Sequence, residues 1–165
     1  MPDSPRLVVV NTTPIIALSL IDQFDLLQKL YGRVSIPAAV QAEILAAGTS
    51  GVGVRELRKS AWVDVVSLQD PSRADLLADL ERGEAEVIAL AQEQSAGLVI
   101  IDERLARRHA KRLGMPLTGT LGVLLRAKQL GLVGAIEPLI DQLRQSGIRL
   151  GDDLIAEVLR LAGEC

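Results

Sequence analysis

The chain has 165 residues, of which 48% are hydrophobic, and its mean hydropathy is +0.28; these values indicate one folded domain and exclude intrinsic disorder. It contains one Phe, one Tyr and one Trp, so we expect a core of Leu, Ile, Val and Ala and no aromatic platform for stacked bases. The formal net charge of −3 and the pI near 5.2 exclude the strongly basic footprint of a protein that stays bound to nucleic acid.

The single cysteine and the first residues indicate where the protein works. Cys165 is the last residue, so we expect no internal disulfide and a reducing compartment. The first residues lack the long apolar stretch of a signal peptide, and no apolar run is long enough to span a membrane. We therefore expect a cytoplasmic protein with no membrane segment.

Short strands and helices are predicted to alternate along the chain. Apolar, β-branched runs bounded by polar residues predict buried strands, and apolar residues three and four apart, followed by glycine, predict helices. The strands are expected at 7–10, 34–36, 62–68 and 98–101, with Leu117 as the candidate start of a fifth. The helices are expected at 15–20, 24–30, 38–47, 54–59, 72–81, 84–94, 103–113, 121–130, 135–145 and 152–161. This alternation indicates an α/β fold with a parallel sheet that helices cover on both faces.

Polar side chains stand where two of the predicted strands end. Asn11 follows the strand at 7–10, and Asp102 follows the strand at 98–101. Open parallel sheets bind ligands outside the carboxyl ends of their strands, so both side chains face one crevice if these strands are neighbours. The alternative is helix capping, because Asn and Asp are favoured N-cap residues and a helix follows each of them.

Two glutamates lie on or beside the apolar faces of predicted helices. At 100° per residue, Glu43 lies on the edge of the apolar face of the helix at 38–47, and Glu84 shares a face with apolar residues of its own helix. A carboxylate near a core is costly unless it is paired or bound to a metal. The alternatives are a rim position for Glu43, with its head group in water, and a first-turn acid that complements the helix dipole for Glu84.

Together these side chains form an oxygen-only set with no His or Cys cluster, which suits Mg²⁺ or Mn²⁺. Such a cation shields phosphate charge, so the pattern indicates phosphodiester hydrolysis by metal-activated water. We expect His109, the only histidine, to pack on its helix rather than act as a base. The sequence contains no GxxxxGK[ST], GxGxxG or GxSxG motif.

The helix predicted at 103–113 has a positive strip beside Asp102. The strip consists of Arg104, Arg107, Arg108, Lys111 and Arg112. A strip of this kind is either a solvated helix face or a site that binds the backbone of a nucleic acid.

Five segments, in their order and spacing, resemble the PIN domain. They are LVVVNTTPIIAL, IPAAVQAEIL, GEAEVIALA, LVIIDERLARR and GTLGVLLRAKQLG. The resemblance is closest to an uncharacterised prokaryotic branch related to VapC-type toxins. It implies a three-layer α/β/α sandwich with a short parallel sheet. Within a single domain of residues 1–165, it places the motif-bearing core at about 7–132 and a C-terminal helical extension at about 133–165.

The resemblance also implies an Mg²⁺- or Mn²⁺-dependent ribonuclease with carboxylates at the ends of its strands. The positions of the family's four acids, both catalytic and metal-binding, fall on Asn11, Glu43, Glu84 and Asp102. A gapless alignment from Gly97 places the third acid on Glu86 instead, so we keep Glu86 as an accessory residue. Thr12 and Thr120 occupy positions where the family often has hydroxyls near the metal.

Asn11 departs from the aspartate of typical PIN nucleases. Its amide oxygen can bind a hard cation, but one negative charge is lost, which predicts weaker metal binding. The expected protein is a homodimeric endoribonuclease, the toxin of a toxin–antitoxin pair, with an antitoxin protein as partner and with Arg104, Arg107 and Arg108 positioning the RNA. The alternatives are a degenerate PIN module that binds RNA or a protein without cleavage, and a metal-dependent phosphatase acting on small substrates.

Overall fold

One parallel sheet organises the computed structural model, which describes residues 7–164 and leaves Cys165 outside the described residues. Its strands are β1 (Val8–Val10), β2 (Val34–Pro37), β3 (Val63–Val66), β4 (Leu98–Ile100) and β5 (Leu117–Thr118). They lie in the order β3-β2-β1-β4-β5, and every neighbouring pair is parallel. The strands predicted from the sequence are therefore confirmed, including the short fifth strand.

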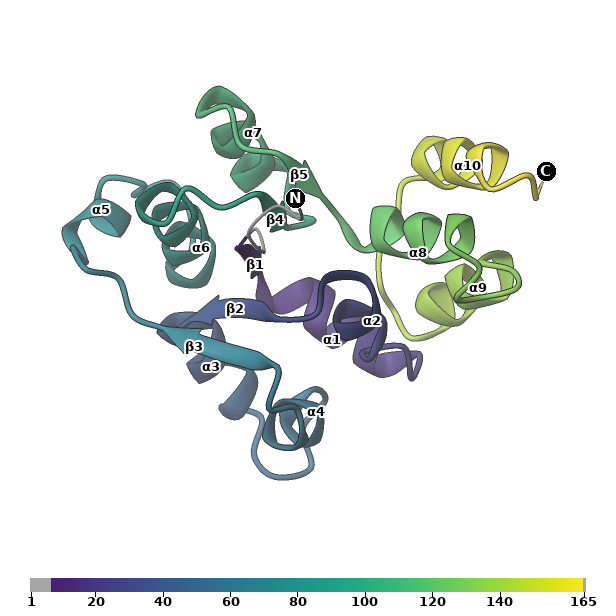
Figure 1. Cartoon of the computed structure of the whole chain (residues 1–165), viewed down its shortest axis with the longest axis horizontal. Helices are drawn as coiled ribbons and strands as arrows, with labels where there is room; N and C mark the ends of the chain where they lie inside the picture. Colours follow the sequence, from purple (N-terminus) through teal and green to yellow (C-terminus); the bar gives the residue numbers. More distant parts are fainter. Residues whose placement is uncertain (1–6, 165) are drawn as a thin grey trace, which may run out of the picture.

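Helices flank this sheet, as the alternation of elements predicts. They are α1 (Thr12–Leu20), α2 (Leu26–Tyr31), α3 (Ala38–Leu45), α4 (Val54–Lys59), α5 (Ser72–Asp75), α6 (Arg82–Glu93), α7 (Arg104–Arg112), α8 (Thr120–Gln129), α9 (Glu137–Gln145) and α10 (Asp152–Leu161). Helices α5, α6 and α7 lie on one side of the strands, and α1, α2 and α8 lie on the other (Figure 1). The predicted α/β fold is confirmed. None of the helices in the described part of the chain is both long and apolar enough to cross a membrane.

The helix predicted over 72–81 is wrong beyond its first turn. Only α5 is helical there, and the chain then forms separate turns in which Leu77 N donates to Ala74 O and Leu80 N donates to Leu77 O. Glu81 is extended, with φ −66° and ψ 158°, because it caps the start of α6. The turns leave Leu80 packed against the core while Leu76 is 85% exposed.

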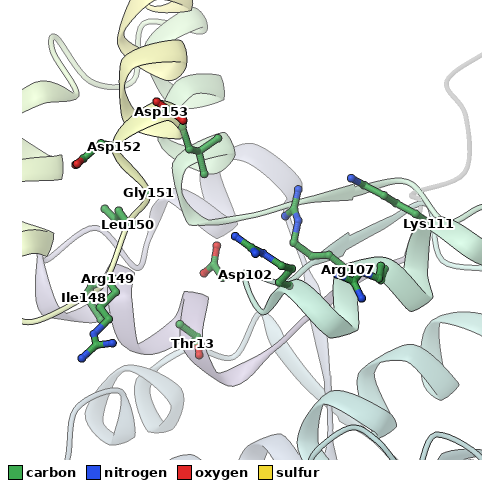
Figure 2. A pocket seen from close by; sticks show the side chains of 13 residues that line it. Thr13, Asp102, Arg107, Lys111, Ile148, Arg149, Leu150, Gly151, Asp152 and Asp153 are labelled. Atoms are coloured by element: carbon green, nitrogen blue, oxygen red, sulfur yellow. The ribbon is translucent and has the colours of Figure 1, made fainter.

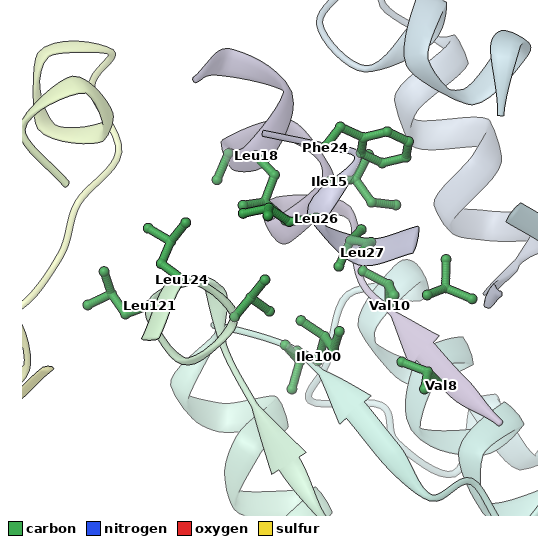
Figure 3. Packing of buried hydrophobic residues seen from close by; sticks show 14 of the residues in the cluster. Val8, Val10, Ile15, Leu18, Phe24, Leu26, Leu27, Ile100, Leu121 and Leu124 are labelled. Atoms are coloured by element: carbon green, nitrogen blue, oxygen red, sulfur yellow. The ribbon is translucent and has the colours of Figure 1, made fainter. Parts of the chain in front are cut away.

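The core is built on the two central strands. All three residues of β1 are buried, and Val99 and Ile100 of β4 are fully buried. Continuous β-branched runs of this kind are typical of parallel strands that are covered on both faces. Figure 3 shows Val10 and Ile100 beside Leu27, with Leu124 of α8 nearby.

The order of the strands reverses beside β1. The chain moves outward from β1 to β2 and β3, and then returns across the sheet to place β4 on the other side of β1. Val10 is level with Ile100, and Asn11 N donates a hydrogen bond to Ile100 O at 2.9 Å. The segments that follow β1 and β4 thus diverge at a topological switch point, where doubly wound sheets form ligand crevices.

A carboxylate near the C-terminus fastens the last helices together. The Glu164 side chain accepts hydrogen bonds from Ile136 N at 2.9 Å and Glu137 N at 3.0 Å, and it forms an ion pair with Lys128 Nζ at 2.9 Å. These contacts join the end of α10 to the start of α9 and to α8. We call this group of contacts the Glu164 latch.

Candidate functional site at the carboxyl ends of β1 and β4

Asn11 lies at the end of β1 with an unengaged amide. Only 4% of the residue is exposed, and its extended backbone (φ −83°, ψ 172°) places it at the N-cap of α1. Its side chain makes no capping hydrogen bond. Within residues 7–164, the Asn11 side chain makes no hydrogen bond to any other group. Helix capping therefore does not explain Asn11, and its amide is available to a ligand in the crevice.

Asp102 follows β4 and is fixed by the start of α8. Its Oδ1 accepts a hydrogen bond from Thr120 N at 2.8 Å, and its Oδ2 accepts one from Thr120 Oγ1 at 2.6 Å. The cap of α7 is instead Glu103, whose carboxylate accepts a hydrogen bond from Ala106 N at 2.9 Å. The alternative that Asp102 caps the helix directly after it is therefore wrong.

Glu43 joins the first helix to the third and the sixth. Thr12 Oγ1 donates a hydrogen bond to Glu43 Oε2 at 2.7 Å. The carboxylate lies against Gly83 in the first turn of α6, where a Cβ atom would overlap Glu43 Oε1. The residue is exposed, in agreement with a rim position, and its head group is held beside α1 and α6.

Glu84 is a partly buried acid with other acids around it. Its Oε1 accepts a hydrogen bond from Glu81 N at 3.1 Å in a capping box, so the first-turn interpretation of Glu84 is correct. Burial raises its pKa, the Glu81 N–H lowers it, and the nearby Glu103, Glu81 and Glu43 carboxylates raise it further. Burial is thus the main cause of the raised pKa of Glu84, and the neighbouring carboxylates add to it.

Glu86 has a different environment from Glu84. Its Oε1 accepts a hydrogen bond from Ala39 N in the first turn of α3 at 3.1 Å, and its Oε2 pairs with Arg82 Nε at 2.9 Å. Glu86 thus links α6 to α3, and Arg82 neutralises the negative charge of its carboxylate. Of the two candidates for the third acid, Glu84 is the one near Glu43.

The donor set fits a divalent cation in its chemistry. Glu43, Glu84 and Asp102 form no ion pair within the described residues. Carboxylate oxygens and an amide oxygen are hard ligands that suit Mg²⁺ or Mn²⁺. In the part of the chain that the structure describes, no three His, Cys, Asp or Glu side chains converge tightly enough to hold an ion as they stand. The residues therefore supply the right donors without enclosing a preformed cage.

A cavity of about 970 Å³ opens beside Asp102 (Figure 2). Its lining comes from α7 and from residues 148–154, with Thr13 of α1. The α7 part contains Arg104, Arg107, Arg108 and Lys111. The structure thus places the three arginines predicted to bind RNA in one cavity with Asp102.

His109 lies on α7 but is not among the residues that line the cavity. Its Nε2 contacts Asp79 Oδ2 at 2.9 Å, so the ring pairs with an acid on the loop before α6. This contact gives His109 a partner on a segment outside its own helix.

Sequence reasoning missed two features of this region. Glu103 contributes to the charge around Glu84, and the adjacent acids at 102 and 103 were the available signal. Residues 148–154, including Arg149, form the second wall of the cavity. Arg149 lies in a connection between two helices, so no periodic pattern marks it.

Two comparisons with known proteins bear on this site. A family model described as a PIN domain matches residues 7–164, which include all of the candidate site residues and the second wall of the cavity. A comparison with curated proteins finds no match to the chain. Since the family model covers nearly the whole sequence, the chain belongs to the PIN domain family.

Proposed function

We propose that this protein is a metal-dependent ribonuclease. Membership of the PIN domain family supports a nuclease-type, hydrolytic function. The observation that carries the proposal is that Asn11 and Asp102 follow the neighbouring strands β1 and β4, with Asp102 in a cationic cavity, while Glu43 lies beside Thr12 and near Glu84. Metal-dependent phosphodiester hydrolysis uses this combination, because negative donors hold a cation and positive groups hold the phosphates.

Asp102, Glu43 and Glu84 would hold Mg²⁺ or Mn²⁺, with Asn11 as a neutral fourth donor. A bound cation of this kind supplies a Lewis acid for phosphate and water. Thr120 orients Asp102 through two hydrogen bonds, and Thr12 orients Glu43 through one.

Arg107 would hold the phosphate next to these donors. Its Nη1 donates a hydrogen bond to Ile101 O at 2.8 Å, so the guanidinium is fixed beside Asp102 before a substrate arrives. A guanidinium fixed in this way binds phosphate oxygens with little loss of side-chain entropy. Arg104 and Arg108 extend the positive surface along α7.

Replacing Asp102 with Asn tests the proposal. The amide introduced in the D102N variant can still hydrogen-bond Thr120, so we expect the fold to persist while cleavage of labelled single-stranded RNA with Mn²⁺ falls about 100-fold or more. Asp141→Asn, an exposed change on α9, is the matched control and should cleave like the wild type. Normal cleavage by D102N would remove Asp102 from the proposed site.

Asn11 favours a second candidate function, a PIN module that binds RNA without cleaving it. The family's first acid is an amide here, and the described side chains do not enclose a preformed metal cage. This candidate predicts a wild-type protein that binds RNA but cleaves none with either Mg²⁺ or Mn²⁺. Detectable cleavage that depends on Asp102 would exclude it.

The biological setting that we propose is the toxin of a toxin–antitoxin pair, with a protein antitoxin as partner. Induction of the wild type in a bacterial host should then arrest growth, whereas induction of D102N at the same level should not. Growth arrest by both proteins would separate toxicity from the proposed cleavage.

A further inference from the structure

The cavity beside Asp102 has two walls of different chemistry. Helix α7 contributes four cations at positions i, i+3, i+4 and i+7, which share one helix face. Residues 148–154 form the opposite wall, with Arg149 among the apolar side chains Ile148, Leu150 and Leu154. Figure 2 shows Arg107 and Lys111 on one side of Asp102 and residues 148–153 on the other.

The positive charge in this cavity is not neutralised by the protein. Its five cations are Arg104, Arg107, Arg108, Lys111 and Arg149, and within residues 7–164 none of them forms an ion pair. Of the acids in the lining, Asp152 pairs with Arg144 at 3.0 Å and Asp102 is hydrogen-bonded to Thr120. Asp153 is the remaining acid.

Both walls are held in place without a ligand. Helix α7 buries Ala106 and Ala110 on its inner side, which directs the cations outward. On the other wall, Ile148 N donates a hydrogen bond to Leu143 O at 3.0 Å, and α10 is anchored by the buried Ile155. A cavity that is formed before binding loses little entropy when a ligand enters.

We infer that this cavity binds the sugar–phosphate backbone of single-stranded RNA next to the cleaved bond. The phosphates lie against α7 and Arg149, while sugars and base edges contact Ile148, Leu150 and Leu154. The identification of the ligand as RNA rests on the proposed function. It makes Lys111 and Arg149 binding residues in addition to the three arginines.

The dimensions of the cavity favour a single strand. Its volume of about 970 Å³ is at the upper end of the ~300–1,000 Å³ range of small-ligand sites, which suits a short segment of one strand. The four cations of α7 extend over about 10 Å at 1.5 Å per residue, which is longer than one phosphate group. A segment of one strand with consecutive phosphates fits both measures.

Binding without metal tests the inference apart from catalysis. The probe is a short fluorescein-labelled oligouridylate, titrated in EDTA and followed by anisotropy. For the double variant Lys111→Ala and Arg149→Ala we expect the Kd to rise about tenfold or more, because two charged contacts are lost. The slope of log K against log salt should decrease in magnitude by about 1.4, as expected for two contacts on a single strand.

Two further variants control for charge. Arg58→Ala with Lys59→Ala, on α4 and outside the cavity, removes the same charge and should change the Kd by about twofold or less, because long-range effects are screened. Asp153→Asn removes the acid without an ion-pair partner from the lining and should tighten binding.

The inference is overturned if the wild type does not bind, if the double variant binds like its control, or if a hairpin duplex binds as tightly as the single strand. Cleavage with Mn²⁺, measured on the same proteins, separates this inference from the proposed function. A wild type that binds in the cavity but does not cleave contradicts the ribonuclease and leaves the binding site standing. Cleavage with a KM unchanged in the double variant contradicts the binding site alone.

Discussion

At the residue scale, two glycines stand where a neighbouring carboxylate occupies the space of a side chain. A Cβ atom on Gly83 would overlap the carboxylate of Glu43, and a Cβ atom on Gly119 would overlap that of Asp102. Gly83 lies inside α6, where glycine is about 0.5–1 kcal/mol less favourable than alanine. We therefore infer that glycine at position 83 serves to leave space for the Glu43 carboxylate.

Gly83→Ala tests this role of the glycine. The added methyl group meets the far end of a flexible, exposed side chain, so we expect Glu43 to turn away and the free energy of unfolding to change by less than about 1 kcal/mol. RNA cleavage should nevertheless fall, because Glu43 leaves the site. Urea denaturation and the cleavage assay measure the two effects.

Gly134→Ala is the control for this change, since nothing lies within 4 Å of its added Cβ. It should leave cleavage unchanged. If Gly83→Ala cleaved like Gly134→Ala, the position of the Glu43 carboxylate would not matter for the reaction.

At the element scale, the Glu164 latch joins the two helices, α9 and α10, between which the second wall of the cavity lies. Only 10% of the Glu164 side chain is exposed. Burial raises the pKa of this carboxyl, but the N–H groups of Ile136 and Glu137 and the Lys128 ammonium lower it more, so the pKa lies below its usual value. The ionised form is therefore the one that stabilises the packing of α8, α9 and α10.

Glu164→Ala should lower the free energy of unfolding at pH 7 by about 1–3 kcal/mol, because it leaves two backbone donors without a partner. A lowered pKa means that this stabilisation is present above the unfolded pKa of 4.5 and is lost as the pH falls through the folded pKa. The difference between wild type and variant should therefore shrink in acid, as followed by urea denaturation at several pH values. A difference that does not depend on pH would show that the charge of Glu164 contributes nothing.

The elements themselves could be predicted from local patterns, and the exceptions have physical causes. Continuous apolar runs identified the central strands β1 and β4, because strands buried on both faces carry no polar positions. The same reasoning extended the helix at 72–81 too far, since the turns after Asp75 are selected by packing of Leu80 rather than by helix periodicity.

The candidate site could be predicted only in part from the sequence. The rule for strand ends located Asn11 and Asp102, because the neighbouring positions of β1 and β4 follow from the parallel fold. The contact of Thr12 with Glu43 and the wall that contains Arg149 join segments far apart in the sequence. Such contacts depend on the packing of whole helices, which no local pattern encodes.

At the scale of the whole molecule, opposite charges are separated around Asp102. The chain has a net charge of −3, yet five cations that form no ion pair within residues 7–164 line the cavity beside this residue. Glu43 and Glu84 do not line that cavity and keep uncompensated negative charge. An anionic strand and a cation can therefore meet at Asp102 despite the acidic composition of the protein.

Calorimetric titration of Mn²⁺ into the wild type, D102N and the control D141N tests the central claim most directly. We predict that the wild type and D141N bind Mn²⁺ and that D102N, still folded by circular dichroism, loses most of this binding. Equal binding by all three proteins would place the cation elsewhere, and no binding by the folded wild type would contradict the proposed metal-dependent site.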